Sequence, residues 1–177
     1  MRSFYTLLIL VFLCLSCTKD QLGEIDIPQN VKLDIDRDGK TDFTIVYQRA
    51  IEGDPIGNYD AVKMYIESQG TNQVLKNEDF YSIFLEDRQV IQIEVDLPYY
   101  WEVTNPAENN TTPLARIRTD YDSVTWQEEW RVLSLEEKET YLIGCKLNEG
   151  NNTKLAFFEF SVDPLTGVFL LCKAELL

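Results

Sequence analysis

The chain has 177 residues with 16 basic and 30 acidic side chains, so its formal net charge at neutral pH is −14. Such an acidic chain repels phosphate backbones, which argues against nucleic acid as a partner. It contains no histidine, so Ser-His-Asp catalysis, Cys-His catalysis and zinc sites built on imidazole are excluded as well. Its length suits a single domain with a sizeable core.

The first predicted element is a secretory signal over residues 1–16. Arg2 carries a positive charge, and no further charged residue occurs before Lys19. The apolar run between them, Leu7–Leu15, is too short for a membrane-spanning helix, which needs about 20 apolar residues. A positive start followed by a short apolar run is typical of an export signal.

The signal ends in Leu13-Cys14-Leu15-Ser16-Cys17, which resembles the lipobox of bacterial lipoproteins. That family usually has leucine three residues before the lipidated cysteine, where this chain has Cys14. The resemblance implies cleavage before Cys17 and lipid on Cys17. Stable attachment takes more than one acyl chain, and lipoprotein processing typically supplies two or three, so the resemblance also implies firm anchoring. Residues 17–29 would then be a lipidated tether. The alternative is an ordinary secretory signal with an incidental cysteine at this position.

An aspartate-rich loop follows the short predicted strand Val31–Leu33. The segment Asp34-Ile35-Asp36-Arg37-Asp38-Gly39-Lys40-Thr41-Asp42 has carboxylates at its positions 1, 3, 5 and 9 and glycine at position 6. Calcium takes six to eight oxygen ligands, and a tight turn must bring them to one point. The predicted ligands are four carboxylates and one backbone carbonyl: Asp34, Asp36, Asp38, Asp42 and Lys40.

This loop differs from an EF-hand. Position 12 of an EF-hand loop is glutamate, whereas here it is Ile45, and strands are predicted on both sides. The segment therefore resembles the strand-flanked DxDxDGxxD loops of extracellular bacterial proteins. The alternative is a plain hairpin turn at Asp38-Gly39 with solvated aspartates. Four carboxylates so close together repel one another without a cation, which favours calcium.

The middle of the chain predicts strands separated by loops. Alternation of apolar and polar residues indicates strands at 43–47, 62–66, 91–95 and 123–132. Glycine and proline make 52–58 a predicted loop, and 105–113 is polar throughout. Ser134 resembles a helix N-cap and predicts one helical turn over 134–138.

Three further features of this region invite functional interpretations. The aromatic run Tyr99-Tyr100-Trp101 is a possible sugar-stacking platform, although such a cluster after a strand is more often part of the core or its rim. Ser123 lies in an Asp-Ser-aliphatic pattern that resembles O-glycosylation sites of Bacteroides-type bacteria. Glu128 and Glu129 cannot act as paired glycosidase carboxylates, because adjacent strand residues point to opposite faces. No catalytic residue is therefore assigned.

The C-terminal region carries the clearest strand signals. Three segments alternate strictly between apolar and other residues, and loops at 148–153 and 163–167 separate them. They predict a three-stranded antiparallel meander with one apolar face. Several short strands at near-regular spacing predict an all-β fold, an antiparallel β-sandwich that is jelly-roll-like or similar, with at most one short helix. It would be a single domain over residues 30–177. The predicted core-facing residues are Tyr141, Ile143, Cys145, Leu147, Ala156, Phe158, Phe160, Val162, Val168, Leu170, Cys172 and Ala174.

Cys145 and Cys172 lie on the two outer strands of this meander. Export into an oxidising compartment favours disulfides. However, the outer strands of a meander lie nearly 10 Å apart, and a disulfide needs Cα atoms within about 7 Å. The prediction is two buried free thiols. A disulfide would remain possible only if one outer strand belonged to the opposite sheet.

Both ends of the chain resemble a group of small secreted lipoproteins of the Bacteroides type. The resemblance rests on the aspartate loop with Asp42-Phe43-Thr44-Ile45, on Tyr141-Leu142-Ile143-Gly144, and on Phe158-Glu159-Phe160-Ser161-Val162-Asp163 before Thr166-Gly167. The second of the C-terminal strands lacks the Gly-Trp pair frequent in that group. The resemblance implies a β-sandwich and a cell-envelope location. It implies no activity.

Two functional hypotheses follow. The favoured one is a non-catalytic cell-envelope lipoprotein, a binding or structural module of unknown ligand that binds an envelope protein, a glycan or only calcium. The alternative is a calcium-assisted polysaccharide hydrolase or lyase that uses carboxylates. Thr18 follows Cys17 in place of the aspartate that retains lipoproteins at the inner membrane. We therefore expect the outer membrane, with the protein facing either the periplasm or the cell surface.

Overall fold

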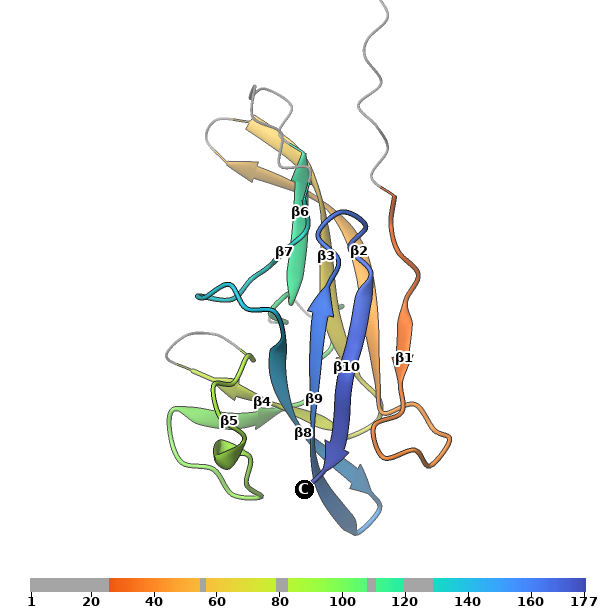
Figure 1. The fold of residues 1–177 in the computed structure, drawn as a ribbon, viewed down its shortest axis with the longest axis vertical. Coiled ribbons are helices and arrows are strands. Elements are labelled where there is room, and N and C mark those ends of the chain that lie inside the picture. Colours follow the sequence, from red (N-terminus) through yellow and green to blue (C-terminus); the bar gives the residue numbers. More distant parts are fainter. Residues whose placement is uncertain (1–25, 55–56, 79–82, 108–110, 120–128) are drawn as a thin grey trace, which may run out of the picture.

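The computed structural model describes residues 26–54, 57–78, 83–107, 111–119 and 129–177. The predicted signal peptide, Cys17 and Ser123 lie outside these residues. Strands pair antiparallel in two sheets of five strands each, which confirms the predicted all-β sandwich (Figure 1). Within the described residues no helix is long and apolar enough to span a membrane.

The first sheet has the strand order β1-β2-β3-β6-β7. Its centre is the long hairpin of β2 and β3, which pair along their whole length from Phe43↔Ser68 to Asp54↔Gly57. The predicted loop at 52–58 is therefore too long, because both strands continue into it. The strands are β1 (Val31–Leu33), β2 (Phe43–Asp54), β3 (Gly57–Ser68), β6 (Ala115–Thr119) and β7 (Arg131–Val132).

The second sheet has the order β10-β9-β8-β4-β5. Its three C-terminal strands form the predicted meander, with Tyr141↔Phe160 in register between β8 and β9 and Phe169↔Val162 between β9 and β10. The strands are β4 (Gln73–Asn77), β5 (Tyr99–Glu102), β8 (Tyr141–Glu149), β9 (Asn152–Val162) and β10 (Phe169–Leu176).

The main core lies between the two sheets. Residues at alternating positions of β2 and β3, such as Ile45 and Met64, meet residues of β8 and β9, such as Ile143 and Phe158, and all four are 0% exposed. This is the burial that period-two alternation predicts, because successive side chains of a strand point to opposite faces. Apolar burial of this kind is the main stabilising term of such a fold.

A smaller apolar cluster covers the outer face of the second sheet. Leu75 of β4 and Phe157 of β9 point away from the main core and pack against Leu85 and Ile91. The segment around 85–97 therefore covers this face of the sheet. It explains why Phe157 is fully buried although it alternates with core-facing Phe158.

The predicted strand at 91–95 is absent. Ile91 is buried, but Ile93 is 59% exposed, so the two do not share a face. Side chains satisfy the carbonyls here in place of a neighbouring strand: Trp101 Nε1 donates to Gln92 O (3.0 Å), and Lys146 Nζ donates to Ile93 O (2.7 Å). Alternation of apolar residues alone could not reveal this.

The one helical element among the described residues is a single 3₁₀ turn, Arg88–Val90 (η1), capped by the side chain of Asp87. The predicted helical turn at 134–138 is wrong, since that segment forms bends. Its backbone amides are used otherwise: Lys138 N donates to the hydroxyl of Tyr141 (3.0 Å). Of the predicted strand 123–132, residues 123–128 lie outside the described part, and the end forms β7.

β10 departs from the predicted face. Phe169 is buried and stacks on Phe160 with ring centroids 5.0 Å apart, whereas Leu170 is 48% exposed. The register then shifts between Leu171 and Lys173. This bulge exchanges the two faces of the strand, so Ala174 packs against the core as predicted, although Leu170 does not.

Cys145 and Cys172 are both unpaired, in agreement with the prediction. Cys145 is fully buried, and burial raises the pKa of its thiol well above the ordinary value. The prediction that Cys172 is buried is wrong. It lies in the bulge of β10, where its thiol is exposed and contacts Ser161 Oγ at 3.7 Å.

One contact joins the two sheets at the end where β9 turns into β10. The hydroxyl of Tyr47 in β2 donates to Gly167 O (2.9 Å) and accepts from Phe169 N (3.2 Å). The ring of Tyr47 meets that of Trp130 edge to face, with centroids 5.7 Å apart. Gly167 has φ of +72°, and a Cβ there would lie 2.1 Å from the Trp130 ring. This position therefore requires glycine.

Candidate metal site

The aspartate loop connects β1 to β2 at the edge of the first sheet. Its two ends are fixed by strand pairing, with Leu33 opposite Phe43 and Asp42 N donating to Leu33 O (2.7 Å). Strands flank the loop on both sides, as predicted. The loop therefore begins and ends on rigid elements, which restricts where its side chains can lie.

The turn within the loop has positive φ at two positions. Gly39 has φ of +89°, in the left-handed region that glycine adopts without strain. Arg37 has φ of +63°, in the same region, where residues other than glycine are uncommon. The carboxylate of Asp34 accepts from the backbone amides of Asp38 (3.1 Å) and Gly39 (2.9 Å). These bonds hold the turn closed.

Asp42 is the most enclosed end of the loop. The residue is only 8% exposed, and its carboxylate accepts from Ile35 N (2.7 Å). Asn72 Nδ2 donates to Asp42 O (3.2 Å). Burial raises the pKa of this carboxyl, and the charges of Asp36 and Asp34 raise it further. A positive ion beside Asp42 would offset both effects.

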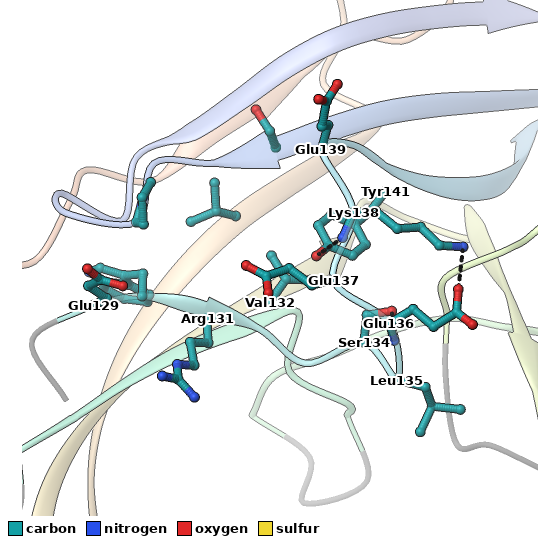
Figure 2. A pocket seen from close by; sticks show the side chains of 14 residues that line it. Glu129, Arg131, Val132, Ser134, Leu135, Glu136, Glu137, Lys138, Glu139 and Tyr141 are labelled. Atoms are coloured by element: carbon teal, nitrogen blue, oxygen red, sulfur yellow. Dashed lines mark hydrogen bonds and ion pairs between the residues drawn. The ribbon is translucent and has the colours of Figure 1, made fainter.

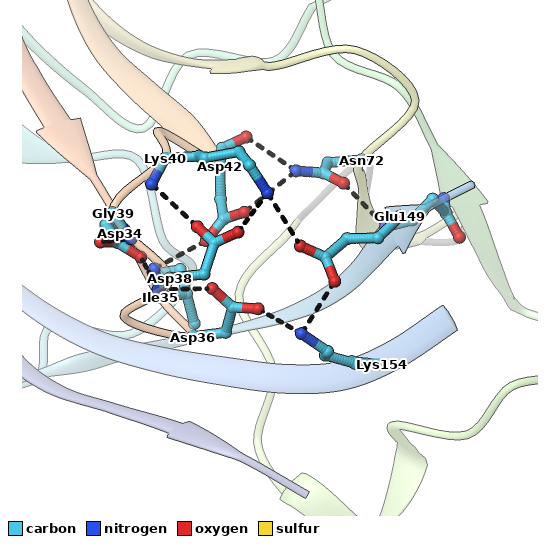
Figure 3. Close-up of polar contacts among 11 residues, drawn as sticks. Asp34, Ile35, Asp36, Asp38, Gly39, Lys40, Asp42, Asn72, Glu149 and Lys154 are labelled. Atoms are coloured by element: carbon cyan, nitrogen blue, oxygen red, sulfur yellow. Dashed lines mark hydrogen bonds and ion pairs between the residues drawn. The ribbon is translucent and has the colours of Figure 1, made fainter. Parts of the chain in front are cut away.

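The carboxylates converge in two overlapping groups (Figure 3). One oxygen from each of Asp34, Asp36 and Asp42 lies within 4.8 Å of the others, and the same holds for Asp36, Asp38 and Glu149. Two oxygens on opposite sides of a calcium ion lie about 5 Å apart, given bonds of about 2.3–2.6 Å. The spacing therefore allows either group to hold a metal ion.

Two lysines lie among these carboxylates. Lys154 Nζ contacts Asp36 at 2.6 Å and Glu149 at 2.9 Å, and these hydrogen bonds raise the pKa of Lys154. Lys40 Nζ contacts Asp38 at 2.5 Å, which lowers the pKa of Asp38. The two ammonium groups thus supply positive charge where the carboxylates meet.

The second sheet contributes to this site. Glu149 ends β8 and Lys154 belongs to β9, while the amide of Asn148 donates to Asn72 Oδ1 (2.8 Å). Asn72 in turn contacts Asp42. The loop of the first sheet is therefore joined to the β8–β9 hairpin of the second. The side chain of Asp36, placed between them, is only 3% exposed.

All four predicted aspartates thus belong to one or both carboxylate groups. The fifth predicted ligand, Lys40, contacts the site through its ammonium group, and a role for its carbonyl stays a prediction. Sequence analysis missed Glu149, which is more than 100 residues from the loop. No local pattern marks it, because only the packing of the two sheets brings it near the aspartates.

The aromatic run of β5 is divided between two faces. Tyr99 and Trp101 pack against the smaller cluster on the outer face, and the Lys146 ammonium lies 4.6 Å from the Trp101 ring centroid. Tyr100 points to the other face, where Lys76 Nζ lies 6.0 Å from its ring centroid. The three rings cannot form one flat platform, and sugar contact by any of them stays a prediction.

The structure also has a hollow of about 480 Å³ beside β7 and the 134–139 segment (Figure 2). Its lining carries four glutamates together with Arg131 and Lys138, and Lys138 forms an ion pair with Glu86 at 2.6 Å. Ligand sites for small molecules are mostly apolar with a few polar groups. This charged lining is typical of a solvated surface. The glutamates are Glu129, Glu136, Glu137 and Glu139.

Comparison with known proteins adds no family. The chain matches no protein-family model, and neither a curated protein nor a solved structure is significantly similar to it.

Proposed function

We propose that this chain is a non-catalytic, calcium-binding module of the bacterial cell envelope, held on a membrane by lipid on Cys17. The observation that carries the proposal is the convergence of Asp34, Asp36 and Asp42 at spacings that suit a metal ion. Asp38 and Glu149 extend the same cluster. All of the side-chain donors are carboxylates, the ligands that calcium prefers over softer donors.

Calcium is favoured over magnesium because of the shape of the site. Magnesium requires near-ideal octahedral geometry at about 2.0–2.1 Å and keeps several waters. The loop holds its carboxylates through backbone turns and lies beside the β8–β9 hairpin of the second sheet. This arrangement suits the longer and more variable bonds of calcium. The ion would neutralise Asp42, whose burial disfavours its charged form.

The test is thermal unfolding in millimolar calcium and in chelator. Calcium that binds only the folded state stabilises it by about 2.7 kcal/mol when its concentration is about 100 times Kd. The melting temperature should therefore rise with calcium. Asp36→Ala combined with Asp38→Ala should abolish the rise.

A matched control is Glu136→Ala with Glu137→Ala, which removes the same charge from a hollow that no residue of the loop lines. It should keep the full response to calcium. Equal melting temperatures of the unmodified protein in calcium and in chelator would exclude the site. Magnesium at the same concentration should give a smaller rise.

The lipid anchor has a separate test. The lipobox-like sequence before Cys17 supports it. Cys17→Ala should leave either an unprocessed precursor or a product that no longer partitions into detergent. If this variant still partitions with the mature mass of the unmodified protein, the anchor is wrong. Protease treatment of intact cells distinguishes surface display from a periplasmic position in the outer membrane.

A further inference from the structure

β10 forms an unusually long free edge. It ends the second sheet, and the described part of the chain places no strand beyond it. The three other sheet edges, β1, β5 and β7, have 3, 4 and 2 residues, whereas β10 has 8. Short edge strands protect proteins against unwanted pairing, and a long edge is a template for another strand.

Backbone groups of β10 point out from this edge. Leu177 N donates to Leu155 O (2.9 Å), and Leu176 is in register with Ala156. In an antiparallel pair, alternate residues direct both backbone groups to the same neighbour. The backbone groups of Lys173 and Glu175 therefore form hydrogen bonds with β9, and the backbone amide and carbonyl groups of Ala174 and Leu176 face the open edge.

The exposed side chains of the strand are largely apolar. Four leucines on or next to β10 are between 46% and 59% exposed: Leu170, Leu171, Leu176 and Leu177. A groove of about 570 Å³ lies between Cys172–Leu176 and residues 35–37 of the aspartate loop. The edge is thus open along the run that follows the bulge, and a partner strand has room beside it.

The charges on this run are self-complementary. Lys173 Nζ and Glu175 lie 2.9 Å apart on one face of the strand. If two copies of β10 paired antiparallel about a two-fold axis at Ala174, Lys173 of each copy would lie directly opposite Glu175 of the other. Opposite charges at directly opposed positions stabilise a strand pair, and like charges destabilise it.

We propose that two copies of this chain associate through their β10 edges, antiparallel about Ala174, so that their second sheets become continuous. The complementary order of Lys173 and Glu175 identifies a second copy as the occupant, since this symmetry pairs each charge with its opposite. An unrelated extended peptide would have no reason to match this register.

Charge reversal tests the proposal in the purified full-length chain in detergent, with mass measured by light scattering across a concentration series. Lys173→Glu and Glu175→Lys each place like charges opposite one another, and each should weaken self-association by about tenfold. The double variant restores opposite pairs and should restore dimers. Thermal melting of each variant shows that it is folded. A monomer at every concentration, or single variants that associate like the unmodified chain, overturns the proposal.

Disulfide trapping gives a second readout that does not depend on charge. In a Cys172→Ser background, Ala174→Cys places the two new thiols opposite one another across the axis, and mild oxidation should give a covalent dimer. Leu135→Cys, at a more accessible position that is 80% exposed, is the control and should stay monomeric. Equal yields of covalent dimer from the two positions would overturn the register.

Discussion

Two loops of this protein are built on the same aspartate turn and differ in what surrounds it. In the β9–β10 loop, Asp163 Oδ1 accepts from the amides of Leu165 (3.0 Å) and Thr166 (2.8 Å). In the β1–β2 loop, Asp34 accepts from two amides in a similar way. Hydrogen bonds that close a turn therefore do not distinguish a purely structural loop from a metal-binding loop.

The difference lies in the neighbours. The Asp163 loop ends in Gly167, which packs against Trp130 and accepts from the hydroxyl of Tyr47, so its surroundings are apolar and aromatic. The Asp34 loop gathers further carboxylates from both sheets. The first loop thus contributes to stability through packing, whereas the second accumulates negative charge that a cation would offset. Four predictions test this distinction.

The largest expected effect is in the β9–β10 loop. Gly167→Ala places a Cβ 2.1 Å from the Trp130 ring and strains the positive φ, so it should lower the free energy of unfolding by about 3 kcal/mol. Chemical denaturation measures this. Gly150→Ala is the control, because Gly150 has φ of +60° but open space around it, and it should cost about 1 kcal/mol. Equal costs at the two positions would show that packing on Trp130 is unimportant.

The second prediction is that the effect of Asp42→Asn on stability depends on whether calcium is present. The raised pKa of Asp42 means that its charged form opposes folding, so the stability that this carboxyl contributes in acid is lost as pH rises through its folded-state pKa. At neutral pH in chelator, Asp42→Asn should be at least as stable as the unmodified protein. In calcium it should be less stable, because a charged ligand is missing. Melting curves of both proteins in chelator and in calcium test this. If Asp42→Asn lowered the melting temperature equally in both conditions, Asp42 would not be a calcium ligand.

The third prediction concerns the lysines beside the carboxylates. Lys154→Met removes the partner of the nearly buried Asp36 and should lower the melting temperature in chelator. Lys40→Met is the control, because the side chain of Lys40 is 76% exposed and exposed ion pairs contribute little. Calcium should reduce the cost of Lys154→Met, since the ion takes over neutralisation of the aspartates. A cost that grows in calcium would indicate that Lys154 supports the site in place of opposing it.

The smallest effect is expected at Asp163. Hydrogen bonds from the Thr166 amide and hydroxyl lower the pKa of this carboxyl, so its contribution to stability is present above its unfolded-state pKa and is lost as pH falls through its folded-state pKa. Asp163→Ala should therefore destabilise the protein more at pH 7 than at pH 3. This dependence should be the same in calcium and in chelator, unlike that of the aspartate loop.

Much of the fold could be predicted because alternation reports which face of a strand is buried. It identified the C-terminal meander and placed Val62, Met64 and Ile66 on one face, and all three are fully buried. It failed for residues 91–95, where burial under a separate cluster and carbonyl bonds from Trp101 and Lys146 replace strand pairing. It also failed at Leu170, since a bulge changes the period without any mark in the sequence.

The candidate site was predictable only where its residues are close in sequence. The four aspartates form a local pattern, because consecutive turns must bring them together. Glu149, Lys154 and Asn72 come from the other sheet or the connection leading to it, and their approach depends on how the two sheets pack. Sequence spacing carries no information on how closely the two sheets approach. These three residues could therefore be placed beside the aspartates only from the structure.

The attachment of the aspartate loop to the β8–β9 hairpin has a mechanical consequence. A pull on the N-terminal side of the domain first loads β1, which is held to β2 by only three paired residues and would unzip one pair after another. The next segment to bear the load is the loop, which is bound to the opposite sheet through Asp36 and Asp42. Peeling would therefore stop there, and further extension would require the two sheets to separate together.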